Sequence, residues 1–265
     1  MFTPNFFKFF KALAKNNNRD WFNEHKPDYQ QQVVEPMCDF IEAMAPRLHK
    51  ISPHFVANPR AHNGSMFRIY RDVRFSKDKS PYKQHAACQF RHVLGKEAHT
   101  VGFYVHISTE EVVFGGGVWM PPSAELQKIR HTIVENPYAW GQIKSSRSVK
   151  QYFGGIGGGG LTRPPRGFDA DHEHIEDIKR KSFFLMRRAP PEIILDDGFV
   201  SEVEKTFKAA MPLMKYIGYA QDIEVWSYPV FKQALSIKEW GWRDYYLATR
   251  WNYWLLIPTA NSISA

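Results

Sequence analysis

Residues 100–108 alternate strictly between two kinds of side chain, and this pattern constrains the fold more than any other feature of the sequence. The apolar positions of the run are Val101, Phe103, Val105 and Ile107. A period of two is that of a β-strand with one buried face. Two shorter strand-like runs, 86–93 and 111–114, lie close on either side. Because the connections are short, the sequence predicts an antiparallel sheet.

Helical periodicity comes before and after these strands. Pro4 and Pro27 each suit the first turn of a helix, and apolar residues follow them at spacings of three and four. A last helix is expected over residues 201–217. Since helices precede the strands and helices follow them, with no strand–helix alternation, the sequence predicts an α+β fold. We expect a mainly antiparallel sheet flanked by helices in a single main domain.

Residues 67–83, FRIYRDVRFSKDKSPYK, hold the densest cluster of charge. Six basic and two acidic residues give this segment a net charge of +4, half of the chain's +8. Its first ten residues alternate like a strand, and the SKDKSP that follows is typical of a turn. The sequence therefore predicts a cationic strand and loop, and charge gathered in this way indicates an anion-binding site.

Further motifs accompany this segment: NNNRDWF at 16–22, YVHI at 104–107, FGGG at 114–117, RPPRGF at 163–168 and KSF at 181–183. Together with residues 67–83 they resemble a widespread family, mainly bacterial and fungal, that is catalogued as a conserved domain of unknown function. The resemblance covers roughly residues 3–218. It implies the extent of a domain and no activity. We therefore expect an α+β domain over residues 1–218 and a C-terminal extension over 219–265.

The extension is rich in aromatic residues. It contains eleven, including five of the chain's eight tryptophans. Large aromatic side chains are usually buried, which favours a helix that packs over the domain or between the subunits of a homo-oligomer. A lid over a ligand, a stacking surface for bases, and a segment foreign to the natural protein are the alternatives.

The candidate ligand-binding residues come mainly from residues 67–83. Arginine binds phosphate through two hydrogen bonds, and lysines in a loop add charge at adjustable positions. The sequence predicts a pocket for a phosphate-bearing ligand lined by Arg68, Arg74, Lys77, Lys79, Tyr82, Lys83 and Tyr104. If the protein is an enzyme, His106 is the expected proton-transfer residue, and Asp72 would orient the arginines. His85, just beyond Lys83, is the other histidine expected nearby.

Two other functions remain open at this stage, and the sequence does not decide whether the protein is an enzyme. A non-catalytic nucleic-acid-binding module would use the same cations as an extended stripe with steep salt dependence. A structural or partner-binding protein would instead pair the cations internally, with Asp72 and Asp78 as the counter-ions.

Common cofactor motifs are not supported, and no cofactor is identified. His172 and His174 lie two residues apart with no completing cluster, so we predict no metal site. Gly155, Gly157 and Gly160 formally match a dinucleotide-binding motif. However, two prolines follow where that motif requires a helix. No phosphate-binding loop with the GK[ST] ending is present.

The remaining features concern location. No apolar run approaches the roughly 18–20 residues of a membrane helix, so no membrane partner is expected. The N-terminal segment lacks the features of a signal peptide, and two cysteines do not make a disulfide framework. A cytoplasmic location is the expectation.

Overall fold

A five-stranded antiparallel sheet forms the centre of the protein. The computed structural model describes residues 1–95 and 100–226. The strands follow one another in the order of the chain: β1 (Phe55–Val56), β2 (His85–His92), β3 (Gly102–Ser108), β4 (Val112–Val118) and β5 (Phe183–Ala189). Every neighbouring pair is antiparallel. The predicted α+β class and antiparallel sheet are confirmed.

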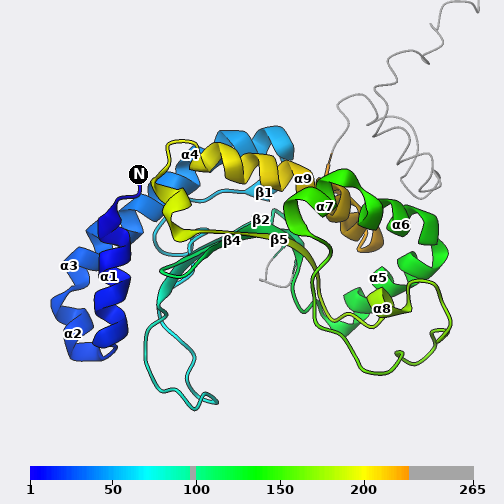
Figure 1. The fold of residues 1–265 in the computed structure, drawn as a ribbon, viewed down its shortest axis with the longest axis horizontal. Helices are drawn as coiled ribbons and strands as arrows, with labels where there is room; N and C mark the ends of the chain where they lie inside the picture. Colours follow the sequence, from blue (N-terminus) through cyan, green and yellow to red (C-terminus); the bar gives the residue numbers. More distant parts are fainter. Residues whose placement is uncertain (96–99, 227–265) are drawn as a thin grey trace, which may run out of the picture.

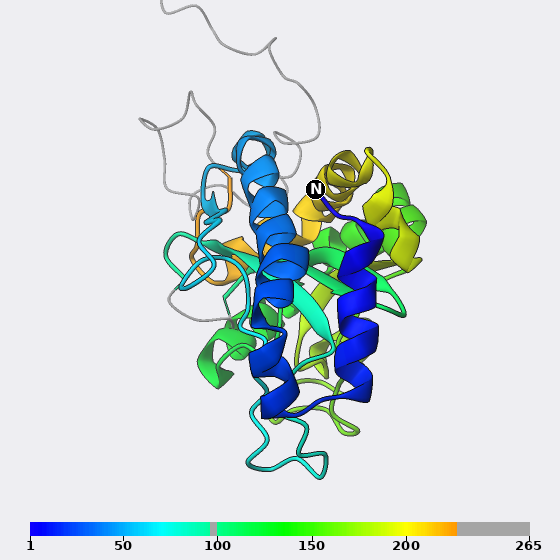
Figure 2. The same cartoon turned by 90° about the vertical axis from the view of Figure 1, so that its left-hand side faces the viewer.

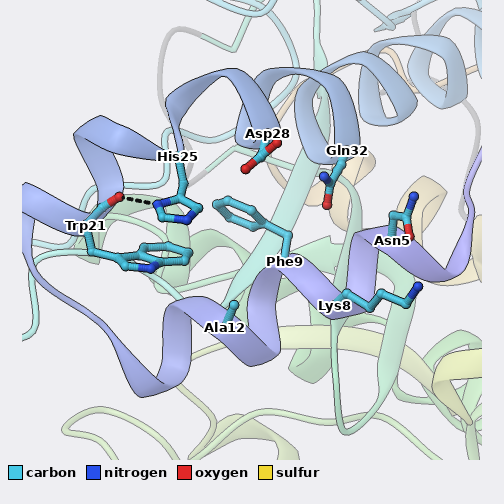
Figure 3. Close-up of a pocket in the computed structure, with 8 residues that line it drawn as sticks. All are labelled: Asn5, Lys8, Phe9, Ala12, Trp21, His25, Asp28 and Gln32. Atoms are coloured by element: carbon cyan, nitrogen blue, oxygen red, sulfur yellow. Dashed lines mark hydrogen bonds between the residues drawn. The ribbon is translucent and has the colours of Figure 1, made fainter.

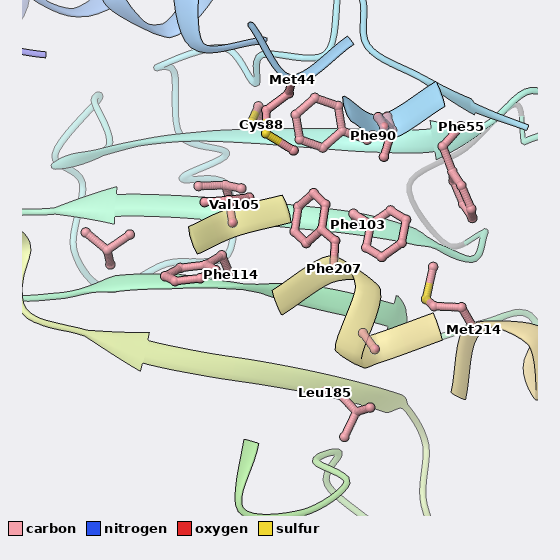
Figure 4. Close-up of a cluster of buried hydrophobic side chains, with 14 of the residues drawn as sticks. Met44, Phe55, Cys88, Phe90, Phe103, Val105, Phe114, Leu185, Phe207 and Met214 are labelled. Carbon is pink, nitrogen blue, oxygen red and sulfur yellow. The ribbon is translucent and has the colours of Figure 1, made fainter. Parts of the chain in front are cut away.

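Two helices cover one face of this sheet. They are α4 (Glu35–Ile51) and α9 (Phe199–Ala220), which lie above the strands in Figure 1. The register places Val105 opposite both Cys88 and Phe114, so apolar residues line up across the strands. Phe207 of α9 stacks on Phe103 with ring centroids 4.3 Å apart (Figure 4). The apolar side of the alternating run is thus buried beneath α9.

The other helices gather at the two ends of the sheet. At one end lie α1 (Pro4–Lys15), α2 (Arg19–Glu24) and α3 (Lys26–Tyr29), and at the other α5 (Ser123–Glu135), α6 (Pro137–Ser145), α7 (Arg147–Phe153) and α8 (Ile175–Ile178) (Figure 1). A 3₁₀ helix, η2 (Pro191–Leu195), precedes α9. Of the described helices, none lies across the middle of the sheet face opposite α4 and α9, which we call the open face. No helix in the described ranges is long and apolar enough to cross a membrane.

A π-helical turn joins α3 to α4. This turn, η1 (Gln30–Val34), has the Glu35 N–H bonded to the Gln30 carbonyl, five residues back. Pro36 has no N–H to donate, so a kink or break is expected at this point of the helical region. The irregular turn just before Pro36 is the form that this break takes.

The predicted strand at the start of residues 67–83 is wrong. These residues form a two-armed loop, here called the cationic ribbon, with isolated bridges only, such as Tyr70 opposite Tyr82. It extends away from the sheet (Figures 1 and 2). Alternation correctly indicated extended backbone, but Arg71 interrupts the apolar side, so no continuous face could be buried in the core.

The glycines at 115–117 also depart from expectation. A run of three glycines is typical of a tight bend, yet all three lie inside β4. Gly115 pairs with Tyr104 on one side and Met186 on the other. The predicted packing of the C-terminal extension lies outside the described residues, apart from residues 219–226. Cys38 and Cys88 are free thiols.

Candidate functional site

The base of the cationic ribbon is fastened to the turn between α1 and α2. The Asn17 side chain donates to the Tyr82 carbonyl at 3.0 Å and accepts from the Tyr82 N–H at 3.1 Å, as a neighbouring strand would. The Tyr82 ring stacks on Phe22 with centroids 4.1 Å apart and is only 3% exposed. Tyr82, a predicted ligand contact, therefore lies in the core and anchors the ribbon.

We expect Asn17→Ala to lower the free energy of unfolding by about 1–3 kcal/mol, because two hydrogen bonds to the ribbon are lost. Chemical denaturation measures this change. Asn23→Ala is the matched control, since Asn23 is exposed on α2. Equal stability of the two variants would contradict an anchoring role for Asn17.

The far part of the ribbon is largely neutralised by its own carboxylates. Asp72 pairs with Arg74 at 2.7 Å, and Asp78 pairs with Arg71. The hydrogen bonds from Arg74 lower the pKa of Asp72 to about 2. Lys79 donates to the Val73 carbonyl at 3.0 Å.

The other four cations of the ribbon have no carboxylate partner. Within the described residues, Arg68, Lys77, Lys79 and Lys83 form no ion pair. Lys83 Nζ donates to the Arg68 carbonyl at 2.8 Å, at the base of the ribbon. Burial and then the nearby Arg68 charge lower the pKa of Lys83. The base of the ribbon thus holds two neighbouring positive charges without a carboxylate between them.

Two histidines of the open face lie beside this base. His85 begins β2 and His106 lies in β3, and their ring centroids are 4.2 Å apart. The Tyr104 hydroxyl lies 3.4 Å from Nδ1 of His106. Phe67 connects this group to the ribbon, because its ring lies 6.2 Å from that of Tyr104 and 5.7 Å from Lys83 Nζ.

The structure therefore brings together only part of the predicted set. Lys83, Tyr104 and His106 converge with Arg68 and His85 at the base of the ribbon, and we call these five residues the ribbon-base site. The residues on the far part of the ribbon are Asp72, Arg74, Lys77 and Lys79. In the described part of the chain, neither a hydrogen bond nor an ion pair joins Asp72 to His106.

Both histidines are held in the neutral state. Burial, the neighbouring His106 and Lys83 together lower the pKa of His85 to about 4. Burial also lowers the pKa of His106; Glu111 opposes this effect and Arg188 adds to it. Glu111 and Arg188 form an ion pair with each other on the same side of the site. Near neutral pH each imidazole therefore has a lone pair with which to accept a proton.

A proton NMR titration should show the His85 ring titrating near pH 4. His106→Ala should raise the His85 pKa, because it opens the site to water and removes the second imidazole. His131→Ala, on α5, should leave the His85 pKa unchanged.

The lowered pKa of His85 also affects stability. Since the folded-state pKa is lowered, the folded protein binds fewer protons than the unfolded chain between about pH 4 and 6.5. The contribution of neutral His85 to stability is therefore lost as the pH falls across that interval. A His85 ring that titrates at its ordinary pKa would contradict this environment.

Two of these roles escaped the sequence reasoning. Asn17 was assigned only to the end of the first helix, although an asparagine just outside a helix has a side chain free to imitate backbone pairing. His85 was named only as a neighbour, because its proximity to His106 depends on the register between β2 and β3.

The acidic segment that contains His172 and His174 has its own internal partners. His172 Nδ1 accepts from the His174 N–H at 3.0 Å, and the His174 ring bonds to the Pro137 carbonyl at 2.9 Å. The described ranges contain no group of three or more side chains placed to hold a metal ion.

Comparison with known proteins places the chain in a family without assigning it a reaction. No curated protein and no solved structure matches it. The model of one family, described as conserved hypothetical protein (DUF2461), matches residues 5–216. The chain therefore belongs to the DUF2461 family of conserved hypothetical proteins.

Proposed function

We propose that the protein binds a phosphate-bearing ligand at the ribbon-base site, between Arg68 and Lys83 of the ribbon and the two histidines of the open face. The supporting observation is the pair of adjacent cations, Arg68 and Lys83: burial first, and then repulsion by the Arg68 charge, lower the pKa of Lys83. An anion between them would relieve that repulsion. Phosphate suits such a site, because a guanidinium can donate two hydrogen bonds to it and an ammonium adds a point charge.

The neighbouring aromatic and imidazole groups indicate how the rest of the ligand would be held. Phe67 and Tyr104 offer ring surfaces next to the cations. His106, neutral near pH 7, would accept a hydrogen bond or a proton from a ligand hydroxyl. The histidine pair thus gives the site a base, while the cations supply charge stabilisation for a phosphoryl group.

A thermal-shift screen tests the proposal with inorganic phosphate, nucleotides and sugar phosphates. One class of small phosphate should raise the melting temperature of the wild type, and Arg68→Met and Lys83→Met should abolish that rise. Lys77→Met is the matched control, because Lys77 is also a cation without an ion pair but lies on the far part of the ribbon. A stabilisation that survives in the first two variants, or none with any phosphate, would refute the site.

A second candidate function is contact with single-stranded nucleic acid through the far part of the ribbon. One observation favours it: Phe75 is 96% exposed, with the Arg74 guanidinium 5.9 Å from its ring and Lys77 two residues away. Exposed aromatic rings stack on bases while nearby cations meet the backbone. Here oligonucleotide binding should fall in Phe75→Ala and Lys77→Met, persist in Lys83→Met, and weaken steeply with salt. Oligonucleotide binding that does not change on substitution of Phe75 and Lys77 would exclude it.

A further inference from the structure

A concave site lies at the end of the sheet occupied by α1, α2 and α3. It is an open pocket of about 270 Å³ that η1 also borders (Figure 3). This volume is below the roughly 300–1,000 Å³ of pockets for drug-sized ligands, so a small molecule fits it. None of its lining residues belongs to the ribbon-base site. We call it the helical pocket.

Aromatic rings form one wall of the helical pocket. Phe9 and Trp21 lie with centroids 5.9 Å apart, and Trp21 stacks on His25 at 4.1 Å with an angle of 14° between the rings. The His25 Nδ1 lies 2.8 Å from the Trp21 carbonyl, which can only accept a hydrogen bond. In the neutral ring Nδ1 is therefore the donor, and Nε2 is left as an acceptor. The pocket thus combines an apolar wall with an acceptor nitrogen.

Opposite charges line the pocket without neutralising each other. Asp28 is half-buried and Lys8 is exposed, and within the described residues neither forms a hydrogen bond or an ion pair. In Figure 3 the Asp28 carboxylate lies on the side of His25, whereas the Lys8 ammonium lies on the far side, near the Asn5 amide. The negative charge is therefore placed toward one side of the pocket and the positive charge toward the other.

This distribution specifies the charge pattern of a ligand. An ammonium group would be attracted to Asp28 and to the faces of the aromatic rings. A carboxylate would be attracted to Lys8 and Asn5. An apolar side group would cover Phe9 and Ala12, which also line the pocket. The irregular backbone supports a binding role, since Gln32 belongs to the π-helical turn η1 and such turns are frequent at functional sites.

We propose that the helical pocket binds a small zwitterion, a free α-amino acid with an apolar or aromatic side chain. The amine lies toward Asp28, the carboxylate toward Lys8, and the side chain against Phe9. This site is independent of the ribbon-base site and of the phosphate ligand proposed there.

Isothermal titration calorimetry of the full chain with free leucine, methionine, phenylalanine and tryptophan tests the proposal. At least one of them should bind. For the amino acid that binds, the amide analogue without a carboxylate and the acid analogue without an amine should each bind about tenfold more weakly or worse. No heat with any of the four, or equal binding of the analogues, would overturn the proposal.

Variants then assign each end of the ligand. Asp28→Asn should weaken binding of the amino acid about tenfold. This variant should bind the amine-free analogue no more weakly than it binds the amino acid itself. Likewise, Lys8→Met should bind the amide analogue, which lacks the carboxylate, no more weakly than it binds the amino acid. The matched controls are Glu24→Gln and Lys11→Met: Glu24 is exposed at the end of α2, Lys11 is exposed on α1, and neither lines the pocket. If the controls weaken binding as much as the test variants, the assignment is wrong.

Thermal unfolding of each variant without ligand shows that it remains folded. Lys83→Met provides a second comparison, because it should leave amino-acid binding unchanged. Loss of phosphate binding alone in Lys83→Met, and loss of amino-acid binding alone in Asp28→Asn, would establish two separate sites. A loss of amino-acid binding in Lys83→Met would contradict their independence.

Discussion

Replacing Gly115 by alanine should lower the free energy of unfolding by about 3 kcal/mol. A Cβ atom at this position would lie 1.8 Å from the carbonyl oxygen of Leu185 and 3.0 Å from the Cα of Met186. Both are main-chain neighbours in β5, so the edge strand β5 would have to separate from β4 along the ladder that joins it to the sheet. Chemical denaturation of the purified variant measures the loss.

Gly159→Ala is the matched control for this prediction. A Cβ at Gly159 meets no atom within 4 Å, and its backbone is not in the left-handed region. Its free energy of unfolding should stay within about 0.5 kcal/mol of the wild type. If the two alanine variants are equally stable, the close approach of β4 to β5 at Gly115 is not a constraint on the fold.

Asp177→Ala should also cost about 3 kcal/mol, because Asp177 is a buried carboxylate with several donors. Its side chain is 2% exposed and accepts from Trp140 Nε1 at 2.9 Å, Lys144 Nζ at 2.6 Å and Arg180 Nε at 3.0 Å. The variant leaves the Trp140 donor unpaired within the core. Lys144 and Arg180 retain partial access to water, which limits the loss. Asp197→Ala, at an exposed position, is the control and should be neutral.

The pH dependence of stability gives a second measurement for Asp177. Burial by itself raises the pKa of this carboxyl, but the hydrogen bonds from Lys144, Trp140 and Arg180 outweigh burial and hold the pKa below its ordinary value. The stabilisation is therefore fully present above the ordinary aspartate pKa of about 3.9 and is lost as the pH falls toward the folded-state pKa. When the pH falls from about 5 to about 3, Asp177→Ala should lose less stability than the wild type. An unchanged acid response would refute this role.

Asp177 has a structural role in this fold. The acidic segment around it has the residue types of a metal site, and its residues instead connect α8 to α6 through Trp140 and Lys144. This connection holds the helices at the end of the sheet opposite the helical pocket (Figure 1). The two proposed sites therefore depend on parts of the fold that the Asp177 cluster does not touch directly.

Local patterns in the sequence predicted the middle strands β2 and β3 and the start of β4. The alternation of residues 100–108 predicted β3 and its buried face, because a period of two leaves only one side for apolar packing. Short connections predicted the antiparallel order, since a parallel pair needs a long crossover. The helical stripe near the C-terminus likewise predicted α9, although the helix continues past Gly218 to Ala220. Packing against Val225 explains that continuation, because the missing side chain of Gly218 leaves room for it.

The candidate site was predictable only in outline. Charge density in residues 67–83 located a cationic segment, but charge says nothing about which cations find carboxylate partners. The fold paired Arg71 and Arg74 and left Arg68 and Lys83 beside each other. It also brought His85 to His106, because the register of two strands sets which side chains meet across them.

Sequence alone thus determined the fold class, the buried face of the sheet and the segment that carries the charge. These properties depend on residues that are close together along the chain, so the spacing of apolar and charged residues is enough to predict them. Tertiary structure decided the extended form of the ribbon, the anchoring of Tyr82 by Asn17, the histidine pair and the helical pocket. Asn17 and Tyr82 are far apart in sequence, and even the helical pocket, whose lining lies within residues 5–32, is formed by the packing of separate helices. Such contacts follow from how whole elements pack together.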